Sequence, residues 1–173
     1  IGNTGVINVG SLVLTSNDIQ TTGGLLDPTT GAIRFRGASG SNSTVTVNGA
    51  INAEQALAQA GSSYVALVAP RIVQAGAVSV NGSAAYVAAE QADIRINGGL
   101  FDINVLVGAE GGNVITHTGT TTGPEQQTGG LAQRIYMVAI PKNVAVGMLV
   151  SGQVGYQDGA TTAITHSDGS IVL

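Results

Sequence analysis

Short β-type runs that repeat along the chain restrict its fold more than any other feature of the sequence. The tripeptide apolar-Asn-Gly recurs at Val47–Gly49, Val80–Gly82 and Ile96–Gly98, next to runs rich in β-branched residues at alternating positions. Each run is too short to bury its own apolar face, so the copies must stack on one another. Copies of about 20 residues without helices predict the coils of a parallel β-helix, about six to eight in this chain.

Two alignments of the chain with itself predict how the copies stack. Thr46–Ala53 resembles Val73–Val80, and a period of 22 residues places Ser63–Ala66 over Ala85–Ala88. Because strands of neighbouring coils lie about 4.8 Å apart, like residues are expected to stack on like. The sequence therefore predicts which residues face each other across adjacent coils.

The period of 22 residues also predicts an ion pair. It places Ile72 over Ile94 and Arg71 over Asp93. A basic and an acidic residue in register on an outer face form a cross-strand pair, which contributes well under about 1 kcal/mol when exposed. We expect the Arg71–Asp93 pair to set the register of the coils rather than their stability.

The composition suits a narrow β interior and excludes several classes of protein. The chain of 173 residues contains 26 glycines and only 9% charged residues, with a net charge of −4. Six basic residues and a negative net charge argue against a nucleic-acid binder. No apolar run approaches the roughly 18 residues of a membrane span, and the absence of cysteine excludes disulfides and thiolate metal sites.

The alternation of apolar residues predicts the core and the segments outside it. One stretch, Ala53–Ala60, has the propensity of a helix. Gln20–Gly31 and Gly108–Gly130, rich in glycine and threonine, break the repeat and are expected to leave the coil stack. The expected interior residues are Val47, Ile51, Val65, Leu67, Ile72, Val78, Val80, Val87, Ile94 and Ile96.

An antiparallel sandwich is the alternative to the parallel β-helix. In a sandwich, the Asn-Gly pairs would be hairpin turns.

Part of the sequence is similar to a known family. The similarity lies in Gly49–Ala53, Ser63–Val73 and Ala75–Ser79, after a lead-in at Ile7–Ser16 followed by Asp18-Ile19 and Ile33–Phe35. These segments resemble the filamentous haemagglutinin N-terminal domain, the secretion module of two-partner secretion exoproteins. The resemblance covers roughly residues 5–107. The Asn-Pro-Asn-type motif of the family, which lies upstream of its lead-in, is missing here, which puts an intact secretion-recognition function in question.

The resemblance implies a fold, a location and partners. It implies a right-handed parallel β-helix with extra-helical excursions, and recognition of the unfolded chain by the outer-membrane barrel of the secretion system. It also implies a large secreted or cell-surface protein used for adhesion, contact killing or filament building. The residues themselves indicate neither catalytic activity nor a cofactor. The chain opens at Ile1 in the middle of a β pattern. We therefore expect one domain over residues 1–173 that is processed or part of a longer protein.

Few residues suggest chemistry. His117 and His166 lie in polar, glycine- and threonine-containing stretches and are expected to be exposed loop residues, without the signature of a catalytic triad or metal site. A β-helical carbohydrate-active enzyme, the main alternative, would need clustered acids with basic residues on one face. The candidates for that cluster are Arg71, Asp93, Arg95 and Asp102.

Binding without catalysis is expected on the excursions. Loops positioned by a rigid scaffold often carry binding residues. An ice- or surface-binding solenoid would need Thr-x-Thr arrays on every coil, and only Thr44–Thr46 fits. The candidate binding residues on the excursions are Leu25, Leu26, Asp27, His117, Thr118 and Glu125.

The two ends of the chain predict self-assembly. The first fourteen residues and Ser170–Leu173 are strand-like and contain no amphipathic helix or charged plug. Uncapped ends of equal cross-section expose backbone donors and acceptors, and a heterologous contact between them propagates. We expect head-to-tail stacking or strand donation between copies, which would build an extracellular filament.

Overall fold

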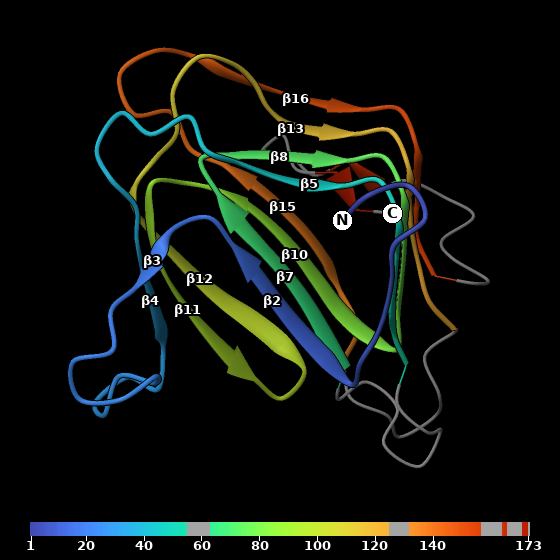
Figure 1. Cartoon of the computed structure of the whole chain (residues 1–173), viewed down its shortest axis with the longest axis horizontal. Helices are drawn as coiled ribbons and strands as arrows, with labels where there is room; N and C mark the ends of the chain where they lie inside the picture. Colours follow the sequence, from blue (N-terminus) through green and yellow to red (C-terminus); the bar gives the residue numbers. More distant parts are fainter. Residues whose placement is uncertain (55–62, 125–131, 157–163, 166–170, 173) are drawn as a thin grey trace.

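The described part of the chain is all-β. The computed structural model describes residues 1–54, 63–124, 132–156, 164–165 and 171–172, and in these residues the chain forms strands and no helix (Figure 1). Three sheets, here called A, B and D, are parallel throughout. Such sheets do not occur in the antiparallel sandwich that the sequence left open. Within the expected helix Ala53–Ala60, Ala53 ends a strand and residues 55–60 lie outside the described part.

The strands of the three parallel sheets come from distant parts of the chain. Sheet A contains β1 (Val6–Asn8), β6 (Ala50–Ala53), β9 (Ala77–Val80), β14 (Thr120–Thr122) and β17 (Gln153–Val154). Sheet B contains β2 (Ser11–Thr15), β7 (Ser63–Ala69), β10 (Gly82–Ala88) and β15 (Ile135–Ala139). Sheet D contains β5 (Thr44–Val47), β8 (Arg71–Gln74), β13 (Gly112–His117) and β16 (Val146–Val150).

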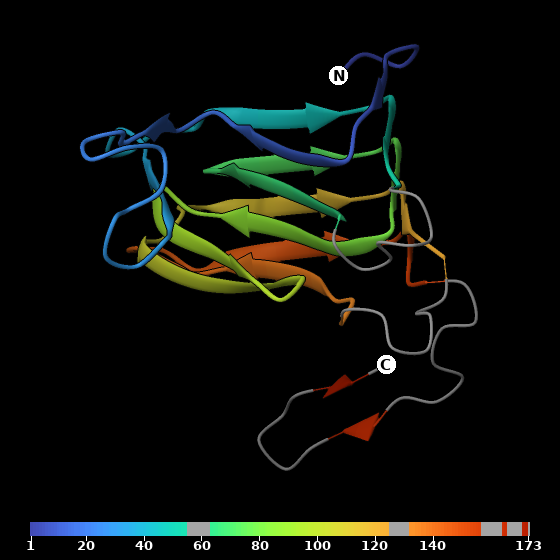
Figure 2. The same ribbon diagram turned by 90° about the horizontal axis from the view of Figure 1, so that it is seen from below.

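The chain visits sheets A, B and D in turn, and each circuit lies next to the previous one (Figure 2). The described residues complete four such circuits and begin a fifth with β17. This is fewer than the six to eight coils expected, because long insertions lengthen some circuits. Outside these circuits, β18 (Ile164–Thr165) and β19 (Ile171–Val172) pair with each other.

One predicted alignment is confirmed and the other is wrong. Thr46 pairs with Val73 and Ala53 with Val80, as the first alignment requires. In sheet B, however, Ser63 lies opposite Gly82 rather than Ala85. This shift of three residues is an odd number, so it exchanges the two faces of the strand. The tyrosines on which the second alignment depended therefore face opposite sides of sheet B.

Two insertions between sheets B and D build a fourth sheet, sheet C. Its strands are β3 (Asp18–Ile19), β4 (Ile33–Arg36), β11 (Gln91–Asn97) and β12 (Leu100–Val107), in the antiparallel order β12-β11-β4-β3. The first insertion belongs to the first circuit and the second to the third circuit, so sheet C joins segments far apart in the sequence.

Sheet B has apolar residues on both faces, and they divide the core in two. The near-continuous apolar sequence of its strands is typical of a parallel sheet that is covered on both sides. Sheet C covers its outer face. Of the predicted interior residues, the central core contains Val47, Ile51, Val65, Leu67, Ile72, Val78 and Val80, the core under sheet C contains Val87 and Ile94, and Ile96 is partly buried against the latter.

Glycines occupy the corner between sheets D and A in successive circuits. A Cβ atom on Gly76 would meet the carbonyl oxygen of Gly49, one on Gly119 that of Gly76, and one on Gly152 that of Gly119. None of these glycines has a positive φ angle. The requirement for glycine at this corner therefore comes from the close approach of neighbouring backbones rather than from an unusual φ.

One of the two predicted excursions is confirmed in its position. Gln20–Gly31 lies between β3 and β4, outside the parallel sheets, and contacts β4 through a bridge between Leu26 and Ile33. The expectation for Gly108–Gly130 is wrong, because this segment contains β13 and β14 of the parallel sheets. Its residues 125–130 lie outside the described part.

The second excursion is instead the hairpin of β11 and β12. Asn97 pairs with Leu100 across Gly98 and Gly99, whose φ angles are 56° and 82°. Two positive φ angles in a two-residue loop are typical of the tight turns that join antiparallel strands. The three copies of apolar-Asn-Gly predicted a coil at this position as at the other two, whereas the structure has a hairpin here.

Candidate functional site

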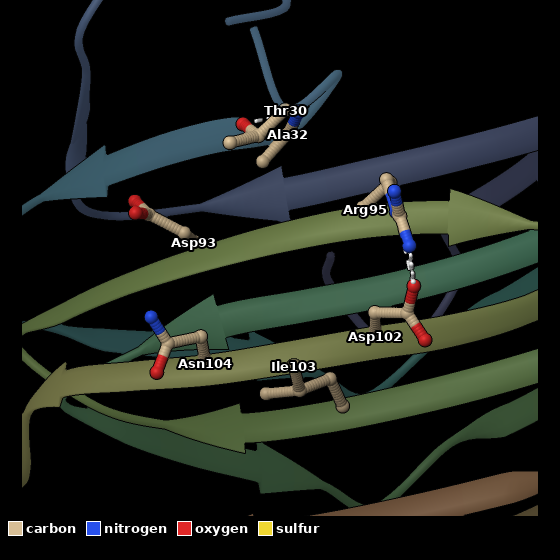
Figure 3. A pocket seen from close by; sticks show the side chains of 7 residues that line it. All are labelled: Thr30, Ala32, Asp93, Arg95, Asp102, Ile103 and Asn104. Atoms are coloured by element: carbon tan, nitrogen blue, oxygen red, sulfur yellow. Dashed lines mark hydrogen bonds and ion pairs between the residues drawn. The ribbon is translucent and has the colours of Figure 1, made fainter.

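The outer face of sheet C carries a shallow polar pocket of about 330 Å³ (Figure 3). Strands β11 and β12 and the loop before β4 supply its walls. The residues that line it are Thr30, Ala32, Asp93, Arg95, Asp102, Ile103 and Asn104.

The alternation of β12 positions the side chains of the pocket. Phe101 is buried against the outer face of sheet B, whereas Asp102 and Asn104 are exposed. Across the hairpin, Arg95 lies opposite Asp102 and Asp93 lies opposite Asn104. The two nitrogens Nε and Nη2 of Arg95 donate to the same oxygen of Asp102, Oδ2, at 3.0 and 2.6 Å. Both side chains of this ion pair are about half exposed.

Asp93 pairs with Arg36 rather than with Arg71, so the predicted ion pair is wrong. Nη1 of Arg36 lies 2.6 Å from Oδ1 of Asp93. Arg71 belongs to sheet D, where its guanidinium donates to the backbone carbonyls of Glu110 and Gly111 at 3.1 and 2.8 Å. The misaligned period of 22 residues placed two residues of different sheets in register.

The structure brings together three of the four residues considered for a carbohydrate-active enzyme. Asp93, Arg95 and Asp102 line the pocket, and Arg71 does not. Each of the two carboxylates already pairs with a guanidinium group. With planar, hydrogen-bonding groups on an open surface, this arrangement suits the binding of a polar ligand.

The loop that borders the pocket is held by Asp27. Its carboxylate accepts hydrogen bonds from the backbone N–H groups of Thr29 and Thr30 at 3.0 and 2.8 Å, and from Arg34 at 2.9 Å. These backbone hydrogen bonds, first that of Thr30, together with the charge of Arg34, lower the pKa of Asp27. Asp27, one of the predicted binding residues, therefore positions the loop and does not itself line the pocket.

The other predicted binding residues do not gather at one place. Leu25 and Leu26 are exposed on the Gln20–Gly31 loop. Thr118 is exposed at the corner after β13, and Glu125 lies outside the described residues. The sequence-based choice missed Asn104 and the contribution of Thr30. The Asn-Gly-Gly turn between two alternating runs was the signal for this hairpin.

His117 is fully buried, so the expectation of an exposed loop histidine is wrong. It belongs to β13, and its side chain points into the space enclosed by sheets A, B and D. Nε2 lies 2.8 Å from the hydroxyl oxygen of Thr121, which in turn lies 2.5 Å from the hydroxyl of Tyr86. The rings of Tyr86 and His117 meet edge to face. His166 lies outside the described residues.

Burial controls the protonation of this internal polar cluster, formed by Tyr86, His117 and Thr121. Desolvation lowers the pKa of His117 and raises that of Tyr86, so both groups stay neutral near neutral pH. On the neighbouring strand, Gln74 lies in register with His117 and donates to the carbonyl of Thr120 at 3.1 Å. The cluster is thus an uncharged hydrogen-bonded element inside an apolar core.

The buried histidine predicts a pH dependence of stability. In the unfolded chain, His117 titrates near its ordinary pKa of 6.5, whereas in the folded chain it titrates at lower pH. Unfolding therefore binds a proton between these two values, and the free energy of unfolding should fall as the pH is lowered below about 6.5. We expect thermal unfolding followed between about pH 7.5 and about pH 5 to show a smaller loss of Tm for His117→Gln than for the original chain. Equal losses in both proteins would contradict this assignment.

An ion pair with a buried carboxylate fixes the start of the β11–β12 hairpin of sheet C. Glu90, between β10 and β11, is 2% exposed, and its Oε2 lies 3.0 Å from Nζ of Lys142. Its other oxygen accepts from the backbone N–H of Gly40 at 2.9 Å. Because a buried charge is tolerated only when it is paired, these contacts connect the loop before β5 and the segment after β15 to the start of the hairpin.

In the described part of the chain, the last complete circuit has inward-facing residues that no further strand covers. Met148 and Val150 lie in register with the buried Ile115 and His117, so they share the inward orientation of those residues. Their side chains are nevertheless 49% and 47% exposed. Strands β15, β16 and β17, which form this end, are edge strands of sheets B, D and A. Here this is called the open end.

The opposite end of the stack is partly covered. The terminal amine of Ile1 donates to the carbonyl of Thr46 at 2.7 Å, and the carbonyl of Ile1 accepts from the N–H of Asn48 at 2.9 Å. Ile1 also packs against the central core. Residue 1 thus occupies part of the edge of β5, so the two ends of the described stack differ.

Comparisons with known proteins and searches for other kinds of site add no assignment. Neither family models, nor curated proteins, nor solved structures gave a match to the chain. The described residues contain no cluster of three or more side chains suited to hold a metal ion. In the same part of the chain, no helix has the length and apolarity to cross a membrane.

Proposed function

We propose that the chain is a non-enzymatic, structural and adhesive part of a secreted bacterial exoprotein of the filamentous haemagglutinin type. In this proposal the parallel sheets form a right-handed parallel β-helix, and sheet C consists of its extra-helical excursions. The observation that carries the proposal is the passage of the chain through sheets A, B and D in a constant order, circuit after circuit. Such stacked, quasi-one-dimensional folds offer long surfaces rather than enclosed catalytic sites.

The position of the resembling segments supports this proposal. Gly49–Ala53 and Ala75–Ser79 coincide with neighbouring strands of sheet A, and Ser63–Val73 spans β7 and most of β8. The lead-in Ile7–Ser16 spans most of β1 and all of β2. The similarity in sequence thus follows the repeated circuits. By the same resemblance, the partner during export is the outer-membrane barrel of a two-partner secretion system, and the destination is the cell surface.

The open end supports association between copies as the structural activity. Met148 and Val150 present exposed apolar side chains that no described strand covers, next to the backbone groups of strands that lie at the edges of the described sheets. Exposed edges and apolar patches of this kind promote strand pairing with another chain. The start of a second copy, where β1 and β2 are edge strands of the described sheets, offers two of the sheets in the same order.

Assembly through the open end is tested with two single substitutions on β16. Met148→Lys places a charge on the inward-facing, uncovered position, so it should reduce association of the purified chain at least about tenfold. Leu149→Lys is the matched control, because Leu149 lies in register with the half-buried Thr116 and faces outward. Light scattering after size-exclusion chromatography measures association, and electron microscopy shows whether the assemblies are linear.

Two outcomes would contradict assembly through this end. The first is a monomer at all concentrations. The second is equal loss of association in both lysine variants, which would assign the contact to the outer face of sheet D instead.

A further inference from the structure

The hairpin of β11 and β12 presents four planar polar side chains in a two-by-two array. Asp93 lies opposite Asn104, and Arg95 lies opposite Asp102. Neighbouring strands are about 4.8 Å apart, and residues two positions apart on one strand are about 6.8 Å apart. All four side chains line the same pocket and stand on the same face of the sheet (Figure 3). The array therefore offers hydrogen-bonding groups over an area of one small ring.

The array keeps hydrogen-bonding capacity that the protein does not use. Arg95 directs two donors to one oxygen of Asp102, and the other oxygen, Oδ1, accepts no hydrogen bond from the described residues. Within the same part of the chain, the side-chain amide of Asn104 makes no hydrogen bond. An amide supplies two donors and one acceptor oxygen, and a carboxylate oxygen accepts more than one hydrogen bond. A ligand here would meet both donors and acceptors.

Each carboxylate that lines the pocket is paired with a guanidinium group, one of them that of Arg36 outside the lining, and this pairing decides the class of ligand. Arg36 neutralises Asp93 and Arg95 neutralises Asp102, at 2.6 Å in both pairs. A site for an ion would need an excess of the opposite charge. Ala32 and Ile103 add apolar groups to the lining. The pocket is therefore suited to a neutral molecule that carries several hydroxyl groups and has an apolar edge.

We propose that this pocket binds one neutral saccharide unit of a surface glycan. The volume of about 330 Å³ lies at the lower end of the range for small-molecule sites, which fits a single sugar ring. Only the adhesive role of this binding rests on the proposed function. The experiment measures saccharide binding to the purified chain, on a face other than the open end. Either proposal can therefore fail while the other stands.

The experiment titrates the purified chain with methyl glycosides of glucose, galactose and mannose. Changes in the NMR signals of the Asn104 side-chain amide and of Arg95 Nε report the site. We expect at least one glycoside to bind, and Asn104→Ala to weaken that binding about tenfold, because it removes the groups that would contact the ligand directly. Asn97→Ala is the control: Asn97 is exposed on the same hairpin but does not line the pocket. It should leave the affinity unchanged.

Galacturonate and calcium chloride serve as the charged probes. Binding of a neutral glycoside that is lost in Asn104→Ala and kept in Asn97→Ala supports the proposal. It is overturned if none of the three glycosides shifts these signals, if both variants bind equally, or if only a charged probe binds.

Discussion

Replacing Gly119 by alanine is expected to reduce the free energy of unfolding by about 3 kcal/mol, because the corner between sheets D and A has no room for a methyl group. The added Cβ would meet the carbonyl oxygen of Gly76 and backbone atoms of Ala75. The same carbonyl of Gly76 accepts the hydrogen bond of the Thr120 N–H at 2.9 Å, so a shift that relieves the contact also weakens the pairing of β9 with β14.

The sign of this effect makes the prediction specific. At a position of ordinary φ, glycine to alanine normally stabilises a protein by about 0.4–1 kcal/mol through the unfolded chain. Gly2→Ala is the matched control, because nothing lies within 4 Å of a Cβ at Gly2. Thermal unfolding followed by circular dichroism should show a Tm about 10 °C lower for Gly119→Ala and almost unchanged for Gly2→Ala. An unchanged or raised Tm for Gly119→Ala would mean that neighbouring circuits are farther apart than described.

Thr121→Val should be strongly destabilising although valine has nearly the same shape and a high preference for β-strands. The hydroxyl of Thr121 is the hydrogen-bond partner of both the Tyr86 hydroxyl and Nε2 of His117. Valine leaves these two polar groups without this partner in the interior, at a cost of about 1–3 kcal/mol for each. We expect a loss of about 3 kcal/mol in the free energy of unfolding, measured by urea denaturation.

Two further variants separate the hydrogen bonds from packing. Thr122→Val changes the next residue of β14, whose side chain is half-buried and points away from the cluster, and should change stability by less than about 0.5 kcal/mol. Tyr86→Phe combined with Thr121→Val should cost less than the two single changes added together, since one unsatisfied hydroxyl is removed along with its partner. Strict additivity would show that the hydroxyl groups are not coupled.

Local sequence patterns predicted the parts of the fold that depend on neighbouring residues. The alternation of apolar residues identified the strands, and it placed Ile51, Leu67 and Val78 inside correctly. The similarity of Thr46–Ala53 to Val73–Val80 predicted their register, because each segment passes through the corner between sheets D and A, at Gly49 and at Gly76, without an insertion. Where local spacing is preserved, a side chain in one circuit lies over its copy in the next.

Contacts between distant segments decided the candidate site. The pocket exists because the two insertions pair with each other, so that Arg36 of β4 meets Asp93 of β11. The tripeptide apolar-Asn-Gly does not indicate whether its glycine lies at a corner between two parallel sheets, as Gly49 does, or in a hairpin turn, as Gly98 does. The packing of the flanking strands selects between them.

The local sequence is enough to predict short strands whose apolar faces must be covered by other copies, since alternation and turn residues act over a few positions. What covers each face depends on contacts between distant segments. Sheet C takes the outer side of sheet B, and the open end leaves Met148 uncovered. His117 is buried for the same reason: its strand joins sheet D through long-range pairing with β8 and β16. The polar residues next to His117 in the sequence do not indicate this burial. His117 and Thr121 form their hydrogen bond only after β14 has paired into sheet A.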